Sequence, residues 1–399
     1  MASTPGSSAP GPPASDATLK AIDDLATRAG IRRVHVLGWR DLDDDEAGGS
    51  ELHADSILSI WARAGLRITM RTSASGGRPP VDVRHGYTVS RRGGRYSVFL
   101  RTPAAELAGR LGRADALVEI WNGMPFLSPM WWRGPSVVWM HHVHGPMWDQ
   151  TLPPLQAKLG HLIEERLAPP WYRRRSIVTL SPSSLEEMVE EQGFDRDAVT
   201  VIPPGIGPAF TPGGERSLHP RVVAVGRLAP VKDFPRLVKL MHRARARVPD
   251  LELVIVGEGY VRDDLAALVS ELDAGDWVRL AGHVSDDELI ELYRSAWMVA
   301  STSTREGWGM TLTEAAATGT PAVVTDIAGH ADAVHHDRSG LLATTDDQLV
   351  DATVRVITDR ALRRRLEEGA LARAAELTWE ACALANFEVL AQDALRRRR

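Results

Sequence analysis

The chain has 399 residues, and its 44% hydrophobic and 25% charged residues are typical of a globular protein. This length exceeds one ordinary core of about 150 residues, so we expect two domains. The formal net charge of −5 argues against nucleic acid as a partner, because no basic surplus exists to neutralise phosphates. Cys382 is the only cysteine, so no intramolecular disulfide and no cysteine-based metal site can form. This usage fits a reducing compartment, and we expect the protein to be cytoplasmic.

The chain begins with a stretch rich in Ser, Pro, Gly and Ala, and we expect residues 1–18 to form a disordered tail. This stretch has neither the basic nor the apolar region of a signal peptide. The longest apolar runs are far shorter than the roughly 18 residues that a membrane span needs. The sequence therefore predicts a protein that is soluble, or at most peripheral to a membrane.

Short runs of Val, Ile and Leu alternate with helical patterns, which indicates βαβ units with parallel strands buried on both faces. The predicted strands are 34–39 and 67–72 in the first half, then 221–226, 251–257, 278–282, 298–302 and 321–326. One exception is expected. Residues 81–90 and 96–100 read as a β-hairpin around Gly93 and Gly94.

Proline and glycine interrupt the pattern between these two series of strands. The fold class is α/β, with two doubly wound Rossmann-like domains that face each other across a cleft, where the carboxyl ends of parallel strands bind ligands. We divide the chain, after its tail, into an N-terminal Rossmann-like domain (19–205), a linker (206–220), a C-terminal Rossmann-like domain (221–375) and a last helix (376–399) that packs back toward the first domain.

The strongest local pattern places Glu306 and Glu314 eight positions apart around the start of a predicted helix. The amides of Gly309, Met310 and Thr311 lie at that start and form an anion site with the helix dipole. A carboxylate accepts hydrogen bonds from a vicinal diol, so the pair could hold a ribose and a second sugar on either side of a phosphate. The alternative is that both acids lie near a helix N-terminus only because negative charge is favoured there.

Arg227 and Lys232 follow the predicted strand 221–226 directly, so both lie at its carboxyl end. An arginine fork and a compact lysine charge suit the two phosphates of a diphosphate. The alternative is a pair of solvated loop cations.

Together these segments resemble the retaining glycosyltransferases of family 4, which have the GT-B fold. The resemblance covers nearly the whole chain. The positions that match the family pattern are Gly226, Arg227, Leu228, Lys232, Glu306, Glu314, Gly319, Pro321, Gly329 and Gly340. Three positions depart from it, with Trp308 in place of Phe, Asp332 in place of Glu and Asp233 in place of Gly. None of them removes a charged group from the site.

The resemblance implies that Arg227 and Lys232 hold a donor diphosphate, that Glu306 contacts the transferred sugar and that Glu314 contacts the ribose. It implies retaining transfer from a UDP- or GDP-linked sugar to a hydroxyl of a glycan, a lipid-linked glycan or a small metabolite. Backbone near His283 and Val284 would recognise the base. The alternatives are a nucleotide-sugar binding protein without transferase activity, and an epimerase or hydrolase on the same fold.

Glycines also follow the first predicted strand, as in the family's Gly-rich first loop. The amides of Gly48 and Gly49 could approach the diphosphate. Asp43 and Asp45 in the same loop imitate a metal-binding DxD pattern, but we expect a solvated acidic loop. Protein cations and helix dipoles would neutralise the diphosphate, so we expect no metal and no cofactor.

A predicted strand that starts at Ser136 ends in three histidines, with His142 and His144 on one face and His141 on the other. Zinc binding and a histidine held by sheet backbone are two interpretations. The resemblance assigns His142 to a family histidine beside the donor sugar and the acceptor, where neutral imidazole could bond a sugar hydroxyl.

Five tryptophans lie within residues 121–148, and we expect most of them to fill the core and one or two to line the acceptor side. The helix-like segment 155–175 ends in WYRRR and the chain ends in LRRRR. These clusters are solvated helix ends or contacts with the inner face of a membrane.

Overall fold

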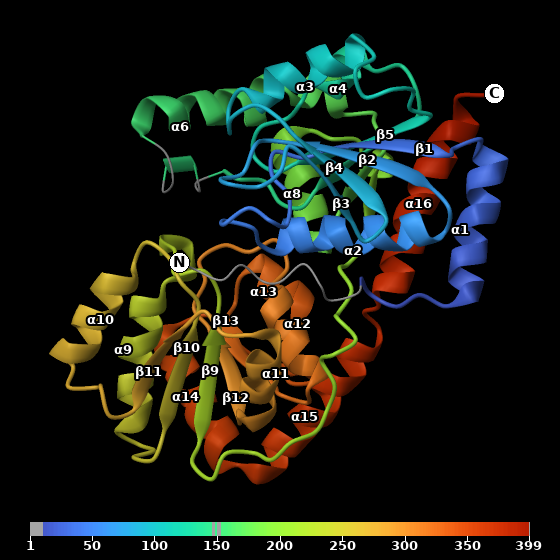
Figure 1. The fold of residues 1–399 in the computed structure, drawn as a ribbon. Helices are drawn as coiled ribbons and strands as arrows, with labels where there is room; N and C mark the ends of the chain where they lie inside the picture. The colour runs from blue at the N-terminus through green and yellow to red at the C-terminus, as the bar shows by residue number, and fades with distance from the viewer. Residues whose placement is uncertain (1–10, 146–147, 150–152, 399) are drawn as a thin grey trace. The chain divides into compact units, whose positions relative to one another are not determined.

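The computed structural model describes residues 11–145, 148–149 and 153–398. The chain forms two compact units, Met1–Gly205 with Thr378–Arg399, and Ile206–Leu377. Figure 1 shows the last helix, α16 (Trp379–Arg396), in red beside α1 (Asp16–Ala29) of the first unit. Helix α1 begins inside the predicted tail, because Ser15 caps it by accepting a hydrogen bond from the Thr18 amide. Residues 1–10 of that tail lie outside the described residues.

The first unit is built on an eight-stranded sheet with the order β3-β4-β2-β1-β5-β6-β7-β8. Every neighbouring pair is parallel except β3 with β4. The strands are β1 (Arg33–Leu37), β2 (Arg67–Thr72), β3 (Val81–Arg84), β4 (Tyr87–Arg91), β5 (Ala116–Trp121), β6 (Ser136–Met140), β7 (Ile177–Thr179) and β8 (Val199–Val201). The helices besides α1 and α16 are α2 (Gly49–Arg63), α3 (Val98–Leu107), α4 (Ser128–Trp131), α6 (Pro154–His161), a π-helical turn (Leu162–Leu167), α7 (Pro169–Tyr172) and α8 (Pro182–Gln192), with a 3₁₀ turn at Arg196–Ala198.

The predicted hairpin has its turn at a different place. Strands β3 and β4 pair antiparallel and turn at His85 and Gly86, whose φ angles are 43° and 90°. Two consecutive positive φ angles are the geometry of a tight hairpin turn. Gly93 and Gly94 instead precede α3, and the Val98 amide bonds to the carbonyl oxygen of Gly94. The prediction of a strand over 96–100 was therefore wrong.

The second unit is built on a six-stranded parallel sheet with the order β11-β10-β9-β12-β13-β14, the strand order of a Rossmann fold. The strands are β9 (Arg221–Val225), β10 (Glu252–Val256), β11 (Val278–Gly282), β12 (Met298–Ser301), β13 (Ala322–Thr325) and β14 (Gly340–Ala343). The helices are α9 (Phe234–Arg245), α10 (Arg262–Glu271), α11 (Asp286–Ser295), α12 (Met310–Ala317), α13 (Ala328–Ala333), α14 (Asp346–Thr358) and α15 (Arg360–Ala375), with a 3₁₀ turn at Pro230–Lys232. The prediction of two parallel α/β domains is confirmed.

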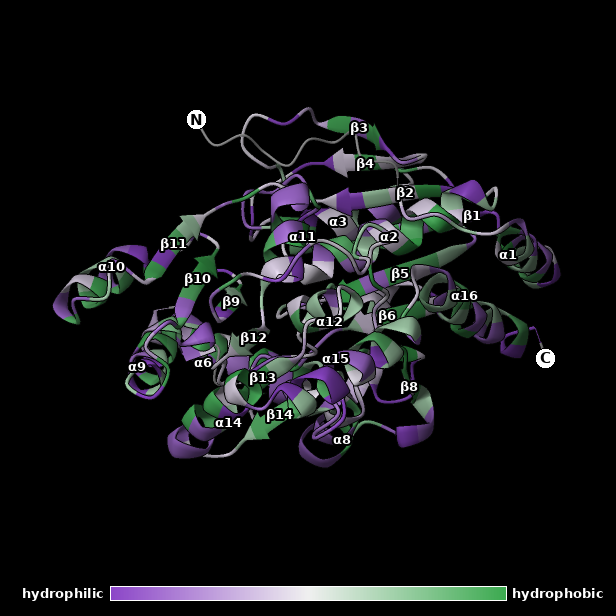
Figure 2. Ribbon diagram, turned by 90° about the horizontal axis from the view of Figure 1, so that it is seen from below, coloured by the Kyte–Doolittle hydropathy of each residue, from purple (hydrophilic) through white to green (hydrophobic). Residues whose placement is uncertain are grey.

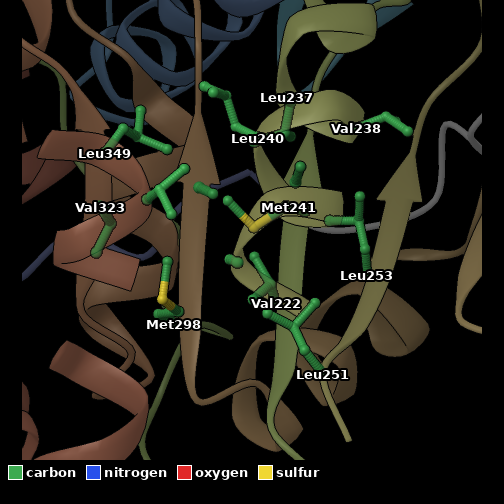
Figure 3. Packing of buried hydrophobic residues seen from close by; sticks show 14 of the residues in the cluster. Val222, Leu237, Val238, Leu240, Met241, Leu251, Leu253, Met298, Val323 and Leu349 are labelled. Atoms are coloured by element: carbon green, nitrogen blue, oxygen red, sulfur yellow. The ribbon is translucent and has the colours of Figure 1, made fainter. Parts of the chain in front are cut away.

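Both sheets are buried between helices. In the second unit, Val222 on β9, Leu253 on β10 and Met298 on β12 pack against Leu237 and Met241 on α9 (Figure 3). In Figure 2, helices such as α14 and α16 carry both green and purple residues, as amphipathic helices that cover a sheet do. Such packing supplies most of the stability of these helices, because burial of apolar surface exceeds helix propensity in magnitude.

Aromatic residues fill much of the first unit's core, as predicted. Trp121 and Trp139 are fully buried and Trp148 is 7% exposed, whereas Trp131 and Trp132 are half-buried. Trp61 on α2 donates a hydrogen bond of 2.9 Å to the carbonyl oxygen of Ala383 on α16, which fastens the last helix to this unit. In the described part of the chain, no helix combines the length and the apolar sequence needed to cross a bilayer.

Candidate active site

Lys232 and Glu306 form an ion pair at the carboxyl edge of the second sheet. Lys232 ends the 3₁₀ turn after β9, and Glu306 lies in the loop between β12 and α12. Because β9 and β12 are neighbouring parallel strands, their carboxyl ends bring these two loops together. The two side chains are 25% and 15% exposed, so the pair is open to a ligand on one side.

Three neighbours keep Glu306 ionised. Burial by itself would raise the pKa of this carboxyl, but the charges of Lys232 and His330 and hydrogen bonds from Lys232 and Ser303 bring the pKa below its usual value. The Ser303 hydroxyl donates at 2.8 Å to the same oxygen, Oε1, that Lys232 contacts. Glu306 is therefore a hydrogen-bond acceptor whose position is defined by its partners.

The conformation of the loop that carries Glu306 also depends on Gly329, which lies in the first turn of α13. A Cβ at Gly329 would collide with the carbonyl oxygen of Glu306, so only glycine permits this approach. The next residue, His330, is buried, and its Nδ1 donates at 2.9 Å to the carbonyl oxygen of Thr325. Burial lowers the pKa of His330 against the charge of Glu306, which raises it, and the Thr325 carbonyl oxygen fixes a proton on Nδ1. Sequence analysis did not select His330, although it adjoins a glycine that matches the family pattern.

Glu314 lies one turn inside α12 in a different environment. Its carboxyl is half-buried, and burial raises its pKa to about 7 against an opposing hydrogen bond from Tyr293 and with a contribution from the charge of Asp286. The Tyr293 hydroxyl on α11 is 3.5 Å from Glu314 Oε2. Tyr293 was not predicted, because nothing in the local sequence connects it with the later glutamate.

The start of α12 has the geometry expected from the sequence. Gly309 precedes the helix with a φ of 99°, a left-handed conformation that favours glycine. The first amides of an α-helix have no partner within the helix, so those of Met310 and Thr311 can donate to an anion. Trp308, which departs from the family pattern, is buried with Arg373 5.5 Å from its ring centroid, and it packs inside the unit.

Close backbone packing orders the loops after β9 and β10. A Cβ at Gly257 would collide with the carbonyl oxygen of Gly226, and one at Gly259 with that of Leu228. Arg227, between Gly226 and Leu228 in the loop after β9, is half-buried.

Asp233 adopts a φ of 47° and caps α9 by accepting from the Arg236 amide at 3.3 Å, so it fulfils the conformational role of the glycine that the family pattern has there. His283 is exposed and Val284 half-buried in the loop after β11, at the same sheet edge but one strand beyond β10.

In the first unit, the Gly48 amide already donates a hydrogen bond to a side chain of the protein. It donates at 2.8 Å to Glu51 Oε2, three residues later at the start of α2, which begins at Gly49. Arg40 holds the other oxygen of Glu51 through its Nε at 3.0 Å. This leaves the first amides of α2 itself, including Gly49, as candidate donors to an anion.

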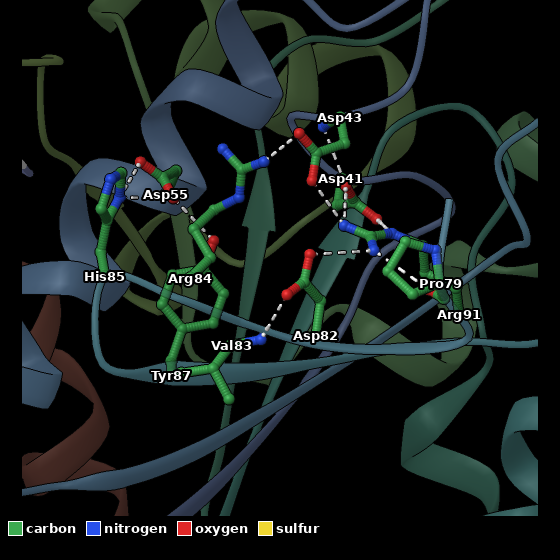
Figure 4. Close-up of polar contacts among 10 residues, drawn as sticks. All are labelled: Asp41, Asp43, Asp55, Pro79, Asp82, Val83, Arg84, His85, Tyr87 and Arg91. Carbon is green, nitrogen blue, oxygen red and sulfur yellow. Dashed lines mark hydrogen bonds and ion pairs between the residues drawn. The ribbon is translucent and has the colours of Figure 1, made fainter. Parts of the chain in front are cut away.

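The first part of the acidic loop is buried, which corrects our expectation of a solvated loop. Asp41 and Asp43 are 1% and 6% exposed and are neutralised by arginines of the β3–β4 hairpin. Figure 4 shows Arg91 between them, with Nε 2.7 Å from Asp41 Oδ2, and Arg84 beside Asp43. These ion pairs hold the pKa of Asp43 below its usual value despite its burial. Asp43 is thus engaged by arginine and is not arranged to bind a metal, whereas Asp45 is exposed.

The three histidines after β6 divide as the alternation predicts. The rings of His142 and His144 stack with centroids 4.7 Å apart. His141 turns into the core, where its Nε2 is 3.1 Å from His53 Nδ1. A zinc site shared by all three is incompatible with this division. Glu164 holds the loop by accepting hydrogen bonds from the His144 and Gly145 amides.

Solved structures with a similar fold include glycosyltransferases. The structure matches sucrose-phosphate synthase from Thermosynechococcus elongatus with a TM-score of 0.78 and 20% identity over 92% of this chain and 100% of that one. It matches Anabaena HepE in complex with UDP and glucose with a TM-score of 0.72 and 18% identity over 90% and 100% of the two chains. The two units therefore define a protein of the GT-B fold class.

Residues 47–210 match the model of Glycosyltransferase Family 4, and residues 212–373 match that of Glycosyl transferases group 1. The chain belongs to the family 4 glycosyltransferases. It is 26% identical to a D-inositol 3-phosphate glycosyltransferase of Pseudarthrobacter chlorophenolicus over 91% of this chain and 95% of that one. A relative of the same name in Stackebrandtia nassauensis is 35% identical over 51% of each chain, so that match spans about half the length of the relative.

Proposed function

We propose that this glycosyltransferase moves a sugar from a nucleoside diphosphate sugar to an acceptor hydroxyl with retention of the anomeric configuration. The observation that carries the proposal is the Lys232–Glu306 ion pair beside the N-terminus of α12. A cation, free helix amides and an ionised carboxylate converge at one sheet edge. This is the chemistry that a diphosphate joined to a sugar requires.

Each group has a separate role in the proposal. Lys232 and Arg227 bind the diphosphate, together with the amides of Gly309, Met310 and Thr311. Glu306 accepts a hydrogen bond from the transferred sugar, and Glu314 accepts from the ribose. The loop of Gly226 and the backbone at His283 and Val284 complete the donor site. HepE has been solved in complex with UDP and glucose and with UDP-glucose, so UDP sugars are the first donors to test.

The reaction proceeds on one face of the sugar. The bond between the anomeric carbon and the diphosphate oxygen breaks as the acceptor oxygen forms its bond from the same side. The acceptor proton passes to the departing phosphate oxygen, whose charge Lys232 and Arg227 stabilise. We propose that no enzyme nucleophile takes part and that Glu306, held by Lys232 and Ser303, serves as a hydrogen-bond acceptor. We propose no metal and no cofactor, because protein cations neutralise the diphosphate.

The acceptor is proposed to bind the first unit beside His142. Curated relatives are named for D-inositol 3-phosphate, which makes this compound the first acceptor to test here, before glycans and lipid-linked glycans.

The two glutamates provide the decisive experiment. At pH 8, Glu314→Gln should weaken UDP by about tenfold or more, since hydrogen bonds to charged groups contribute about 1.5 to 3 kcal/mol. Glu306→Gln should leave UDP affinity nearly unchanged and reduce transfer, because free UDP lacks the sugar that Glu306 contacts. Calorimetry with UDP and GDP measures binding, and product analysis measures transfer.

The same variants discriminate the alternatives. A nucleotide-sugar binding protein would bind UDP and form no glycoside, and an epimerase or hydrolase would alter the donor without an acceptor. Equal loss of UDP affinity in both variants would contradict the division of roles. Glu368→Gln, an exposed glutamate on α15, is the matched control and should change neither quantity.

A further inference from the structure

The outer face of α6 and of the segment that follows it carries a row of exposed apolar side chains. Leu155 is 82% exposed, Leu159 and Leu167 are each 54%, Trp171 is 52% and Leu162 is 43%. Single exposed leucines are ordinary, but a continuous apolar row on a protein surface marks an interaction site. We call these five residues, with their basic neighbours below, the α6–α7 surface.

Helix geometry explains why this row faces outward. Ala157, Gly160, Glu164 and Ala168 are buried at spacings of three and four residues, so they form the inner side of α6 and the π-helical turn. Leu155, Leu159 and Leu162 repeat at spacings of four and three on the opposite side. A surface helix normally presents polar residues there. This helix therefore has an apolar stripe on the side that its own unit does not cover.

The inner side is firmly attached, so the row is not a frayed segment. Ala168 and Tyr172 belong to the buried cluster of Trp121 and Val138. Glu164 accepts a 2.8 Å hydrogen bond from the Trp148 indole nitrogen. In Figure 1, α6 lies at the outer margin of the first unit.

Basic side chains flank the row. Lys158 and Arg166 are exposed on the same stretch, and Arg173 and Arg174 are exposed just after Trp171. The acidic neighbours Glu165 and Asp149 both contact His161, with Oε1 and Oδ2 at 2.6 and 3.0 Å from its ring nitrogens. The charge around the leucines is therefore mainly positive.

We propose that the α6–α7 surface docks on the face of an anionic lipid bilayer. The helix would lie in the interface plane, with its leucines and Trp171 among the upper acyl chains and the basic residues at the lipid phosphates. A second copy of the chain fits less well, because an isologous contact would bring the same four basic residues of both copies together. This inference goes beyond sugar transfer and does not depend on the proposed donor.

Vesicle sedimentation tests the proposal with the full chain. Wild-type protein should bind vesicles of mixed phosphatidylglycerol and phosphatidylcholine, and should bind pure phosphatidylcholine much more weakly. Leu155→Ser with Leu159→Ser should lower the partition coefficient on anionic vesicles about tenfold or more. Leu218→Ser is the matched control, because Leu218 in the second unit is 94% exposed and lies outside this surface.

A second pair of variants tests the charges. Lys158→Gln with Arg166→Gln should lower binding about tenfold, and added salt should reduce wild-type binding more than it reduces binding of this variant. Arg364→Gln, an exposed arginine on α15, should have no effect.

A fluorescent probe locates the contact directly. Leu159→Cys can be labelled selectively, because the natural Cys382 is buried and its thiol pKa is raised to about 12. An environment-sensitive probe at Leu159 should shift to the blue on anionic vesicles, and a probe at Leu218→Cys should not. Equal loss of binding in the Leu218 variant, or no vesicle binding by the wild type, would overturn the proposal. Dimerisation that the Leu155 and Leu159 substitutions abolish would overturn it in favour of a second copy.

Discussion

Replacement of Glu314 by glutamine should stabilise the ligand-free protein at pH 8 and leave its stability nearly unchanged at pH 5. Burial raises the pKa of this carboxyl from 4.5 to about 7, so the folded state binds the proton more tightly than the unfolded chain does. Glu314 therefore costs no stability below pH 4.5, and the cost grows as the pH rises and is complete above about 7. Glutamine carries no charge at either pH and avoids this cost.

The size of the effect follows from the shift. A difference of 2.5 (7 − 4.5) corresponds to about 3 kcal/mol between the two protonation states. Because water reaches part of the carboxyl, we expect about 1 to 2 kcal/mol at pH 8. For a unit of this size that gain raises Tm by roughly 3 to 6 °C. At pH 5 the carboxyl is protonated in the folded state but mostly ionised in the unfolded chain, so about a quarter of the cost remains and the two Tm values should differ by only about 1 °C.

Thermal melting of wild type, Glu314→Gln and the control Glu368→Gln at pH 5 and pH 8 provides the measurement. An equal Tm gain at both pH values would refute the electrostatic reasoning, since it would show that packing and not charge distinguishes the variant. A loss of stability at pH 8 would show that the carboxylate is well solvated or paired. If Glu314→Gln is more stable at pH 8 and also binds UDP more weakly, then Glu314 is a residue kept for function at a cost in stability.

Lys232→Ala should lower turnover about a hundredfold, as loss of one preorganised donor commonly does, while Lys239→Ala on the exposed side of α9 leaves the rate unchanged. Gly329→Ala should reduce transfer while the protein still folds, because the added Cβ displaces the backbone of Glu306; kinetics with circular dichroism would check it. EDTA should leave the transfer rate nearly unchanged, and loss of activity with rescue by Mn²⁺ would contradict metal-independent transfer. Arg91→Leu should destabilise the protein by about 3 to 5 kcal/mol in urea denaturation, because it leaves buried Asp41 uncompensated and leaves Asp43 with Arg84 alone.

Two controls make the last substitution informative. Arg92→Leu changes an exposed neighbour of Arg91 and should alter stability by less than about 0.5 kcal/mol. The double variant in which Asp41→Asn accompanies Arg91→Leu should recover part of the loss, because it removes the unpaired charge while Asp43 keeps Arg84 as its partner. No recovery would mean that Arg91 acts by packing.

Much of the second unit can be predicted from its sequence, because its signals are local. Apolar runs of four to six residues identify β9, β10 and β13 as buried parallel strands, and the carboxyl ends of neighbouring strands necessarily meet at one edge. The order of those strands could not be predicted from the sequence. The family resemblance was nevertheless enough to select Lys232 and Glu306, which the structure brings into contact. Gly309 was also placed correctly at the start of its helix.

Tertiary structure decided the features that depend on partners far away in the chain. Asp43 looked like part of a solvated loop, but Arg84 and Arg91, about 40 residues later, bury and neutralise it. The composition of a loop does not reveal the charge of what packs on it, so only folding converts this acidic run into an ionic core.

The same reason separates the two glutamates, which the sequence presents as alike. Glu306 has a lowered pKa because the turn after β9 brings Lys232 and α13 brings His330 close to it, whereas Glu314 has a raised pKa because burial near Tyr293 brings no cation. A residue type and its spacing determine which chemistry a site can attempt. The dielectric surroundings and the charged neighbours, which determine the protonation state, exist only once the sheet has gathered its loops at one edge.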